Sequence, residues 1–243
     1  MNKFTCIALV MSCFTSCKII TVQQENQTKT TQNLQLGAVG EQRNILWKSD
    51  YNPTAFPDYE DPIKLKVSLV PFNSIKHKAF KKSKQTQDQS VQVTYIDSIK
   101  PKPWFIKLEI ADRVTLINSL NSKENTGVFN FLKQQNRAHI VSAISVVFST
   151  EVMAHLSSVQ EVYLEQLGLH NYVIKTYNND LEQQTILFNK GVVFGYQPSR
   201  VCWKKQAENK FIIGDLVERN SRCPSTTTKR IKETKKPINN YKF

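Results

Sequence analysis

Short runs in which apolar and polar residues alternate are the feature that most limits how this chain can fold. Ile63–Leu69 alternates strictly, and Val91–Tyr95 and Trp104–Ile110 continue the pattern further along the chain. A period of two is typical of a strand that buries one face. The sequence therefore predicts a sheet-containing domain over residues 63–224, in which Asn73–Ser90 forms a polar, basic loop.

Two strand–helix units are expected next. Trp104–Ile110 leads into Asp112, and the apolar run His139–Phe148 leads into Ser149 or Thr150. Asp, Ser and Thr are favoured N-caps because their side chains accept hydrogen bonds from free backbone N–H groups. Apolar residues then recur at helical spacing, at Val114, Leu116, Ile117 and Leu120 and again at Val152, Met153, Leu156 and Val159.

Strands dominate after Asn171. The expected strands are Tyr172–Ile174, Thr185–Phe188, Val192–Tyr196, Val201–Trp203 and Phe211–Ile213. Asn189-Lys190-Gly191 has the composition of a hairpin turn between the second and third of them. We therefore predict a single mixed α+β domain with mostly antiparallel strands and two short strand–helix units, flanked by disordered tails.

The two flanking segments are polar. Residues 17–62 are rich in Gln, Asn and Thr, and residues 225–243 are rich in Thr and Lys without an apolar period. A segment with few large apolar side chains cannot offset the entropy lost on ordering. We expect residues 17–62 to form a flexible tether and residues 225–243 a basic, disordered tail.

Residues 1–16 have the features of a signal peptide. Lys3 supplies a positive charge, Phe4–Met11 begins an apolar stretch, and Thr15-Ser16 places small side chains before Cys17. The stretch is shorter than the about 20 apolar residues that a membrane-spanning helix needs. A cleaved export signal is therefore predicted rather than a permanent anchor.

The segment Phe14-Thr15-Ser16-Cys17-Lys18 resembles the lipobox of bacterial lipoproteins, in a loose form similar to that of the Bacteroidota. The resemblance implies cleavage before Cys17 and acylation of Cys17. Cleavage before Cys13 and cleavage without lipidation remain alternatives. Surface-exported lipoproteins of that phylum often carry acidic residues after this cysteine, whereas Lys18-Ile19-Ile20-Thr21 has none. The resemblance thus implies retention on the periplasmic face of the outer membrane.

The remaining cysteines suit an oxidising compartment. Cys202 and Cys223 stay in the domain after export, and no C-x-x-C pair is present. An even number of cysteines in an exported protein favours a disulfide. A strand pair between them would bring Cys202 and Cys223 together, so we predict a bond between them, with two free thiols as the alternative.

The formal net charge is +13, and removal of Lys3 with the signal peptide leaves 13 − 1 = +12. Such a surplus attracts anionic lipids and acidic glycans, or serves mainly to keep the protein soluble. Lysines cluster at Lys76–Lys84 and again at Lys229–Lys242. Export excludes nucleic acid as a natural partner. The predicted partners are the membrane, through the lipid on Cys17, and an envelope protein or an anionic glycan or lipid.

No motif for catalysis, metal binding or cofactor binding is present. His77, His139, His155 and His170 do not form a helix-borne zinc pattern, and no G-x-S-x-G elbow occurs. We expect His77 to be solvated in its basic loop, and the acidic residues Asp58, Glu60 and Asp61 to lie in a solvated loop rather than at a metal. No catalytic, metal-binding or cofactor-binding residue is assigned, and no cofactor is expected.

These patterns predict a membrane-tethered envelope lipoprotein that acts as a binding or structural accessory component. The alternative is an envelope hydrolase whose catalytic residues carry no recognisable motif, because the members of a triad are distant in sequence. A pocket that joined His139, His155 or His170 to an acid would favour the hydrolase. A solid domain with one apolar surface patch would favour the binding component.

Overall fold

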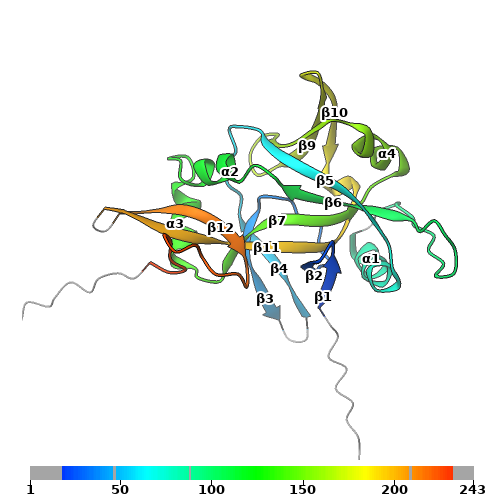
Figure 1. Ribbon diagram of the computed structural model, residues 1–243, viewed down its shortest axis with the longest axis horizontal. Coiled ribbons are helices and arrows are strands. Elements are labelled where there is room, and N and C mark those ends of the chain that lie inside the picture. Colours follow the sequence, from blue (N-terminus) through cyan, green and yellow to red (C-terminus); the bar gives the residue numbers. More distant parts are fainter. Residues whose placement is uncertain (1–17, 46–47, 88, 208–209, 232–243) are drawn as a thin grey trace, which may run out of the picture.

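The computed structural model describes residues 18–45, 48–87, 89–207 and 210–231 (Figure 1). The strands are β1 (Ile19–Val22), β2 (Glu25–Lys29), β3 (Val39–Ile45), β4 (Lys48–Ala55), β5 (Ile63–Pro71), β6 (Trp104–Ile110), β7 (Ala138–Val147), β8 (Glu161–Gln166), β9 (Tyr172–Asn178), β10 (Leu181–Leu187), β11 (Val192–Ala207) and β12 (Lys210–Glu218). The helices are α1 (Ser74–Gln87), α2 (Arg113–Leu120), α3 (Thr126–Gln134), α4 (Thr150–Ser158) and the 3₁₀ turn η1 (Phe188–Lys190).

The described strands form one 12-stranded sheet in which every pairing is antiparallel. Its main path runs β1-β2-β11-β7-β6-β5-β8-β9-β10. Two branches leave that path, because β12 pairs with the far half of β11 and β3 pairs with the start of β7 as well as with β4. The long strand β11 thus joins the N-terminal strands to the C-terminal hairpin.

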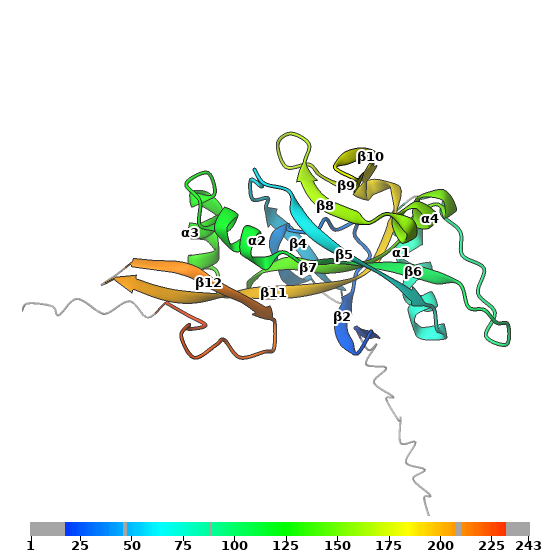
Figure 2. The ribbon, with the colours of Figure 1, turned by 45° about the horizontal axis from the view of Figure 1, so that its top comes forward.

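The two faces of the central strands bury different cores (Figure 2). On one face, α2, α3 and α4 cover a large aliphatic core that includes Ile106, Ile144 and Leu164. On the other face, α1 and the N-terminal hairpin (β1 and β2) cover a smaller core rich in phenylalanine. β6 and β7 have apolar residues at consecutive positions as well as at alternating ones. Because consecutive side chains point to opposite faces, these strands bury side chains on both faces and contribute to both cores.

The expected α+β class and the two strand–helix units are confirmed. Asp112 caps α2 through its Oδ1, which accepts from Val114 N at 3.1 Å and Thr115 N at 3.0 Å. Ser149 caps α4 by accepting from Val152 N. Inside a helix, Asp and Ser side chains compete for the backbone hydrogen bonds. At the first turn the same side chains stabilise the helix, because they accept from N–H groups that have no partner there. Strands β6 and β7 lie where the apolar runs predicted them.

The prediction of a flexible tether over residues 17–62 is wrong for the described part of that segment. β1 and β2 pair with each other and β2 extends to β11, while β3 pairs with β7. The segment buries a sparse set of side chains, namely Ile20, Val22, Leu34, Leu36, Ala38, Val39, Tyr51 and Tyr59. Polar strands gain backbone hydrogen bonds from the sheet, so these few apolar residues are enough to fix the segment.

The basic segment predicted as the loop Asn73–Ser90 instead contains α1. Asn73 Oδ1 accepts from Lys76 N at 2.9 Å and so caps the helix. His77, Ala79, Phe80 and Ser83 form its buried face. Five lysines lie between and beside these buried residues, and the apolar spacing was missed because of them. The segment Val91–Tyr95 is not a strand, although its apolar side chains pack against the same core as α1.

Three further expectations are corrected at the C-terminal half. Asn189-Lys190-Gly191 does not close a hairpin, because η1 occupies it and the flanking strands β10 and β11 pair with other strands. The two short strands expected between Val192 and Trp203 are one continuous strand, β11. The tail is ordered as far as the structure describes it, since Thr228 forms a β-bridge with Trp203 and Ile231 packs against the core. Residues 232–243 lie outside the described residues.

Candidate functional site

The predicted lipid site borders the ordered domain. Cys17 lies outside the described residues, but Lys18 is described, and its carbonyl oxygen accepts from Lys29 N at 2.8 Å. β1 begins at the next residue, Ile19, and buries Ile20 and Val22. The domain therefore starts next to Cys17, without the long polar spacer that the sequence suggested.

A buried charged cluster fixes the N-terminal hairpin to the sheet. Lys107 Nζ on β6 forms ion pairs with Glu25 on β2 and with Glu109, the latter at 3.0 Å. Beside it, Ser145 Oγ donates to Gln27 Oε1 at 2.6 Å. Burial lowers the pKa of Lys107, but the hydrogen bonds with Glu25 and Glu109 outweigh it, so the pKa is raised. Lys107 stays protonated and has a structural role rather than that of a base.

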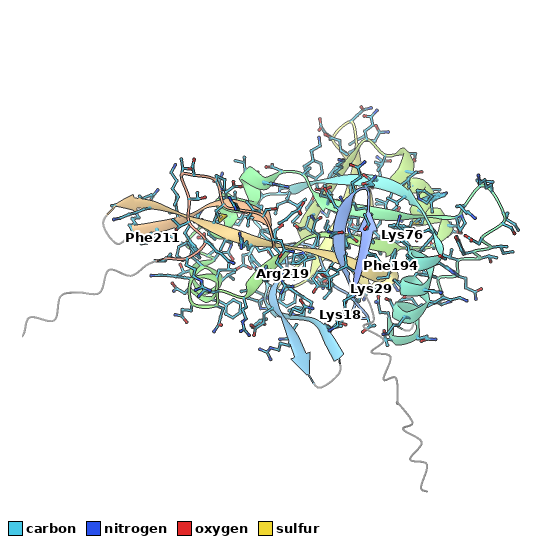
Figure 3. All side chains as sticks on the ribbon, turned by 60° about the horizontal axis from the view of Figure 1, so that its bottom comes forward. Lys18, Lys29, Lys76, Phe194, Phe211 and Arg219 are labelled. Atoms are coloured by element: carbon cyan, nitrogen blue, oxygen red, sulfur yellow. A yellow bond between two sulfur atoms is a disulfide. The ribbon has the colours of Figure 1, made fainter. Side chains whose placement is uncertain are left out.

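Helix α1 is fixed to the open end of this hairpin. Ser83 Oγ donates to Thr30 O at 2.6 Å, and Thr86 Oγ1 donates to Thr31 O at 2.7 Å. Gln87 bridges to β11, where its Oε1 accepts from Val193 N at 2.9 Å. Figure 3 shows Lys18, Lys29 and Lys76 in the same region of the molecule. The side of the domain next to Cys17 thus includes α1.

The exposed surface of α1 is strongly basic. No acidic residue occurs between Asp61 and Asp88, whereas α1 alone contains five lysines. Lys78, Lys81 and Lys82, which we call the basic helix face, are exposed, and Ile75 beside them is 56% exposed. Within the described residues, none of these three lysines is within ion-pair distance of a carboxylate.

The structure does not bring the histidines together with acids among the described residues. His77 is buried in α1 against Phe72 and Tyr95, so the expectation that it is solvated is wrong. His155 Nε2 lies 2.8 Å from Thr176 Oγ1. Burial and the nearby Arg219 lower the pKa of His139 to about 4. These surroundings give no support to a Ser–His–acid arrangement.

The acidic turn before β5 is largely structural. Asp58 Oδ1 accepts from Gln166 Nε2 at 3.0 Å, and its backbone is bonded to Asn125. Glu60 and Asp61 are exposed. Within the described residues, no group of His, Cys, Asp and Glu side chains is placed to hold a metal ion.

An open groove of about 420 Å³ lies on the opposite side of the sheet from α1, between β5 and α4. Leu69, which is 45% exposed, contributes to its apolar lining together with Val67, Leu156 and Val159. β8 pairs with β5 only at Ile63 and Lys64, so the rest of this edge of β5 has no strand partner among the described residues. An apolar groove beside a sheet edge suits binding of an extended segment better than catalysis.

The predicted bond between Cys202 and Cys223 is confirmed, with a Cα–Cα distance of 5.7 Å. Cys202 is fully buried on β11, and Trp203 next to it packs against Phe129 at 5.2 Å between ring centroids. The bond lies within what we call the disulfide arm, residues 199–228, which contains the end of β11, all of β12 and the segment after it.

Comparison with known proteins gives no relative: no protein-family model, curated protein or solved structure matches this chain. Among the described residues, no helix is both long enough and apolar enough to cross a bilayer.

Proposed function

We propose that the protein is an envelope lipoprotein, anchored by acyl chains on Cys17 to the periplasmic face of the outer membrane, with a binding or structural accessory role. The observation that carries this proposal is the segment Phe14–Lys18, with its small residues before a cysteine and no acid after it. Each buried CH₂ of an acyl chain contributes about 0.8 kcal/mol to membrane binding. A single chain therefore binds only marginally, and stable anchoring takes two or more.

The start of β1 at Ile19 gives the anchor a structural consequence. A residue of extended chain spans at most about 3.6 Å, so Lys18 leaves little distance between an acylated Cys17 and the sheet. A lipid at this position holds the folded domain at the bilayer surface rather than at the end of a tether. Such a position suits a protein that keeps a partner close to the membrane.

The role of a binding component is supported by the surfaces of the domain. The groove beside β5 is apolar and open, and the basic helix face is exposed. His155 contacts a hydroxyl group, His77 contacts aromatic rings, and the charge near His139 is positive, so none of these three resembles a histidine paired with a catalytic carboxylate. We therefore favour binding of an envelope protein, glycan or lipid over hydrolysis.

The anchor is tested by producing the wild type and Cys17→Ala in a bacterium that processes lipoproteins. The wild type should fractionate with membranes and have an intact mass that corresponds to cleavage before Cys17 plus acyl chains. Cys17→Ala should be released or remain unprocessed. Cys13→Ala is the matched control and should behave as the wild type. Cleaved Cys17→Ala protein that remains on membranes washed with high salt would refute the proposal.

A further inference from the structure

The position of α1 suggests what its lysines bind. The helix is bonded to Thr30 and Thr31, which follow the strand that pairs with β1. Lys18, the residue after the proposed lipid site, is bonded to Lys29 at the same end of the hairpin. A lipid on Cys17 would therefore bring this side of the domain to the surface of the bilayer.

We infer that the basic helix face docks on anionic phospholipid headgroups and turns the side of α1 and the N-terminal hairpin toward the membrane. This inference rests on the proposed lipid anchor for its setting, but the contact itself needs no lipid on the protein. Lysines near an anionic surface each strengthen binding by roughly fivefold. Three of them acting together give an effect that vesicle binding can measure.

The lysines of the basic helix face are held in a fixed arrangement. Their spacing of three and four residues places Lys78, Lys81 and Lys82 on neighbouring turns of one exposed face. Phe80 anchors the opposite face of α1 in the core, with its ring 5.8 Å from Phe72 and 6.2 Å from Phe194. Charges on a rigid helix approach a flat surface together, and the exposed Ile75 can enter the apolar edge of the headgroup layer.

The molecule provides its own control surface. Lys204, Lys205 and Lys210 are exposed on the disulfide arm, at the other end of β11. Val193, which contacts α1, and Lys205 are twelve residues apart on this strand, which corresponds to about 40 Å. Figures 1 and 3 show the arm pointing away from α1, with Phe211 far from Lys18 and Lys76. The two sets carry the same charge but lie at different distances from Lys18, the first described residue.

The test uses the chain from Lys18 to Phe243 without lipid, which contains every described residue of both cores. Its co-sedimentation is measured with vesicles of phosphatidylcholine alone or mixed with phosphatidylglycerol. The wild type should bind only the mixed vesicles, and added salt should weaken binding because exposed charges are screened over about 8 Å at physiological ionic strength. The variant K78Q/K81Q/K82Q should bind at least about tenfold more weakly. The variant K204Q/K205Q/K210Q should lose about twofold or less.

The inference would be overturned if the K78Q/K81Q/K82Q and K204Q/K205Q/K210Q variants lost vesicle binding equally. Equal binding of the wild type to vesicles with and without phosphatidylglycerol would also overturn it. A melting temperature equal to that of the wild type shows that each variant is folded. In the lipidated protein on mixed vesicles, an amine-reactive label should modify Lys204 and Lys205 more than Lys78 and Lys81, and equal labelling would also contradict the docking. Failure of the anchor appears separately, as Cys17→Ala protein that stays cleaved and remains on membranes washed with high salt, which removes protein held by charge alone.

Discussion

The two ends of β11 are stabilised in different ways. At the α1 end, Phe194 lies among Phe72, Phe80 and Phe105, and its ring centroid is 4.9 Å from that of Phe105. At the other end, the disulfide arm exposes Lys204–Ala207, buries Trp203, Ile213 and Leu216 in the large core, and contains the covalent bond between Cys202 and Cys223. One strand thus takes part in a packed core and in a cross-linked hairpin. The comparison shows that the C-terminal end of β11 combines apolar packing with a covalent bond, whereas the α1 end is held by apolar packing and hydrogen bonds.

The largest expected effect tests the packed end. Phe194 is completely buried, so Phe194→Ala should lower the free energy of unfolding by about 3–5 kcal/mol, through lost burial and a residual cavity. Phe211→Ala is the same chemical change on the disulfide arm, where the side chain is only partly buried, and should cost about 1 kcal/mol. Urea denaturation of both variants measures the difference. Similar losses would show that the two ends do not differ in packing.

The same comparison explains what could be predicted from the sequence. The sequence predicted β6, β7 and the caps of α2 and α4 correctly. Long apolar runs followed by Asp112 and Ser149 are local signals, so no distant partner is needed to recognise them. β1–β4 were missed because these strands join the sheet only through β2, which pairs with β11, and β3, which pairs with β7, and both partners are roughly a hundred or more residues away in the chain. Such partners leave no trace in local composition.

Only part of the basic helix face could be predicted from the sequence. The lysine cluster was evident, but its position on a helix was not, because the charge pattern concealed the spacing of Ala79, Phe80 and Ser83. Asn73 was the signal that could have revealed α1, since Asn is a favoured N-cap. The closeness of α1 to Lys18 depends on contacts across the fold, such as Ser83 with Thr30, and no sequence pattern encodes it. The disulfide was predictable because only two cysteines remain in the domain.

The second prediction concerns the cross-linked end. Cys202 and Cys223 are separated by 21 positions, and a bond that closes a loop of this size contributes about 3 kcal/mol by restricting the unfolded chain. The double variant Cys202→Ser/Cys223→Ser should lose about that amount of stability. Hydrogen exchange should accelerate more over residues 203–228 than over α1, because the bond lies in the arm and local opening of α1 does not involve it.

Reduction of the wild-type protein is the matched control for this variant, because it breaks the bond without placing a hydroxyl in the buried position of Cys202. The reduced wild type and the double variant should show the same pattern of exchange. Acceleration that is as large in α1 as in the arm would mean that β11 transmits the loss along its whole length. The two ends would then unfold as one unit.

The smallest expected effect is a pH dependence at the base of the disulfide arm. His139 lies at the start of β7, where it is 8% exposed and pairs with Gly40 on β3. Burial, followed by the charge of Arg219 and then by those of Arg200 and Lys229, opposes protonation of its ring. A backbone hydrogen bond with Arg137 acts in the other direction, and the result is a pKa of about 4 against the ordinary value of 6.5.

Because the pKa of His139 is lower in the folded protein than in the unfolded chain, the unfolded chain binds a proton first as the pH falls. Folding is therefore unaffected by this group well above pH 6.5, and the free energy of unfolding decreases as the pH falls from 6.5 toward 4. The decrease should reach about 1 kcal/mol near pH 5.5. His139→Gln should remove this part of the pH dependence, and comparison at alkaline pH separates any loss of packing. Denaturation curves of both proteins across this range provide the measurement. An identical slope in the variant would show that the buried His139 does not cause this acid sensitivity.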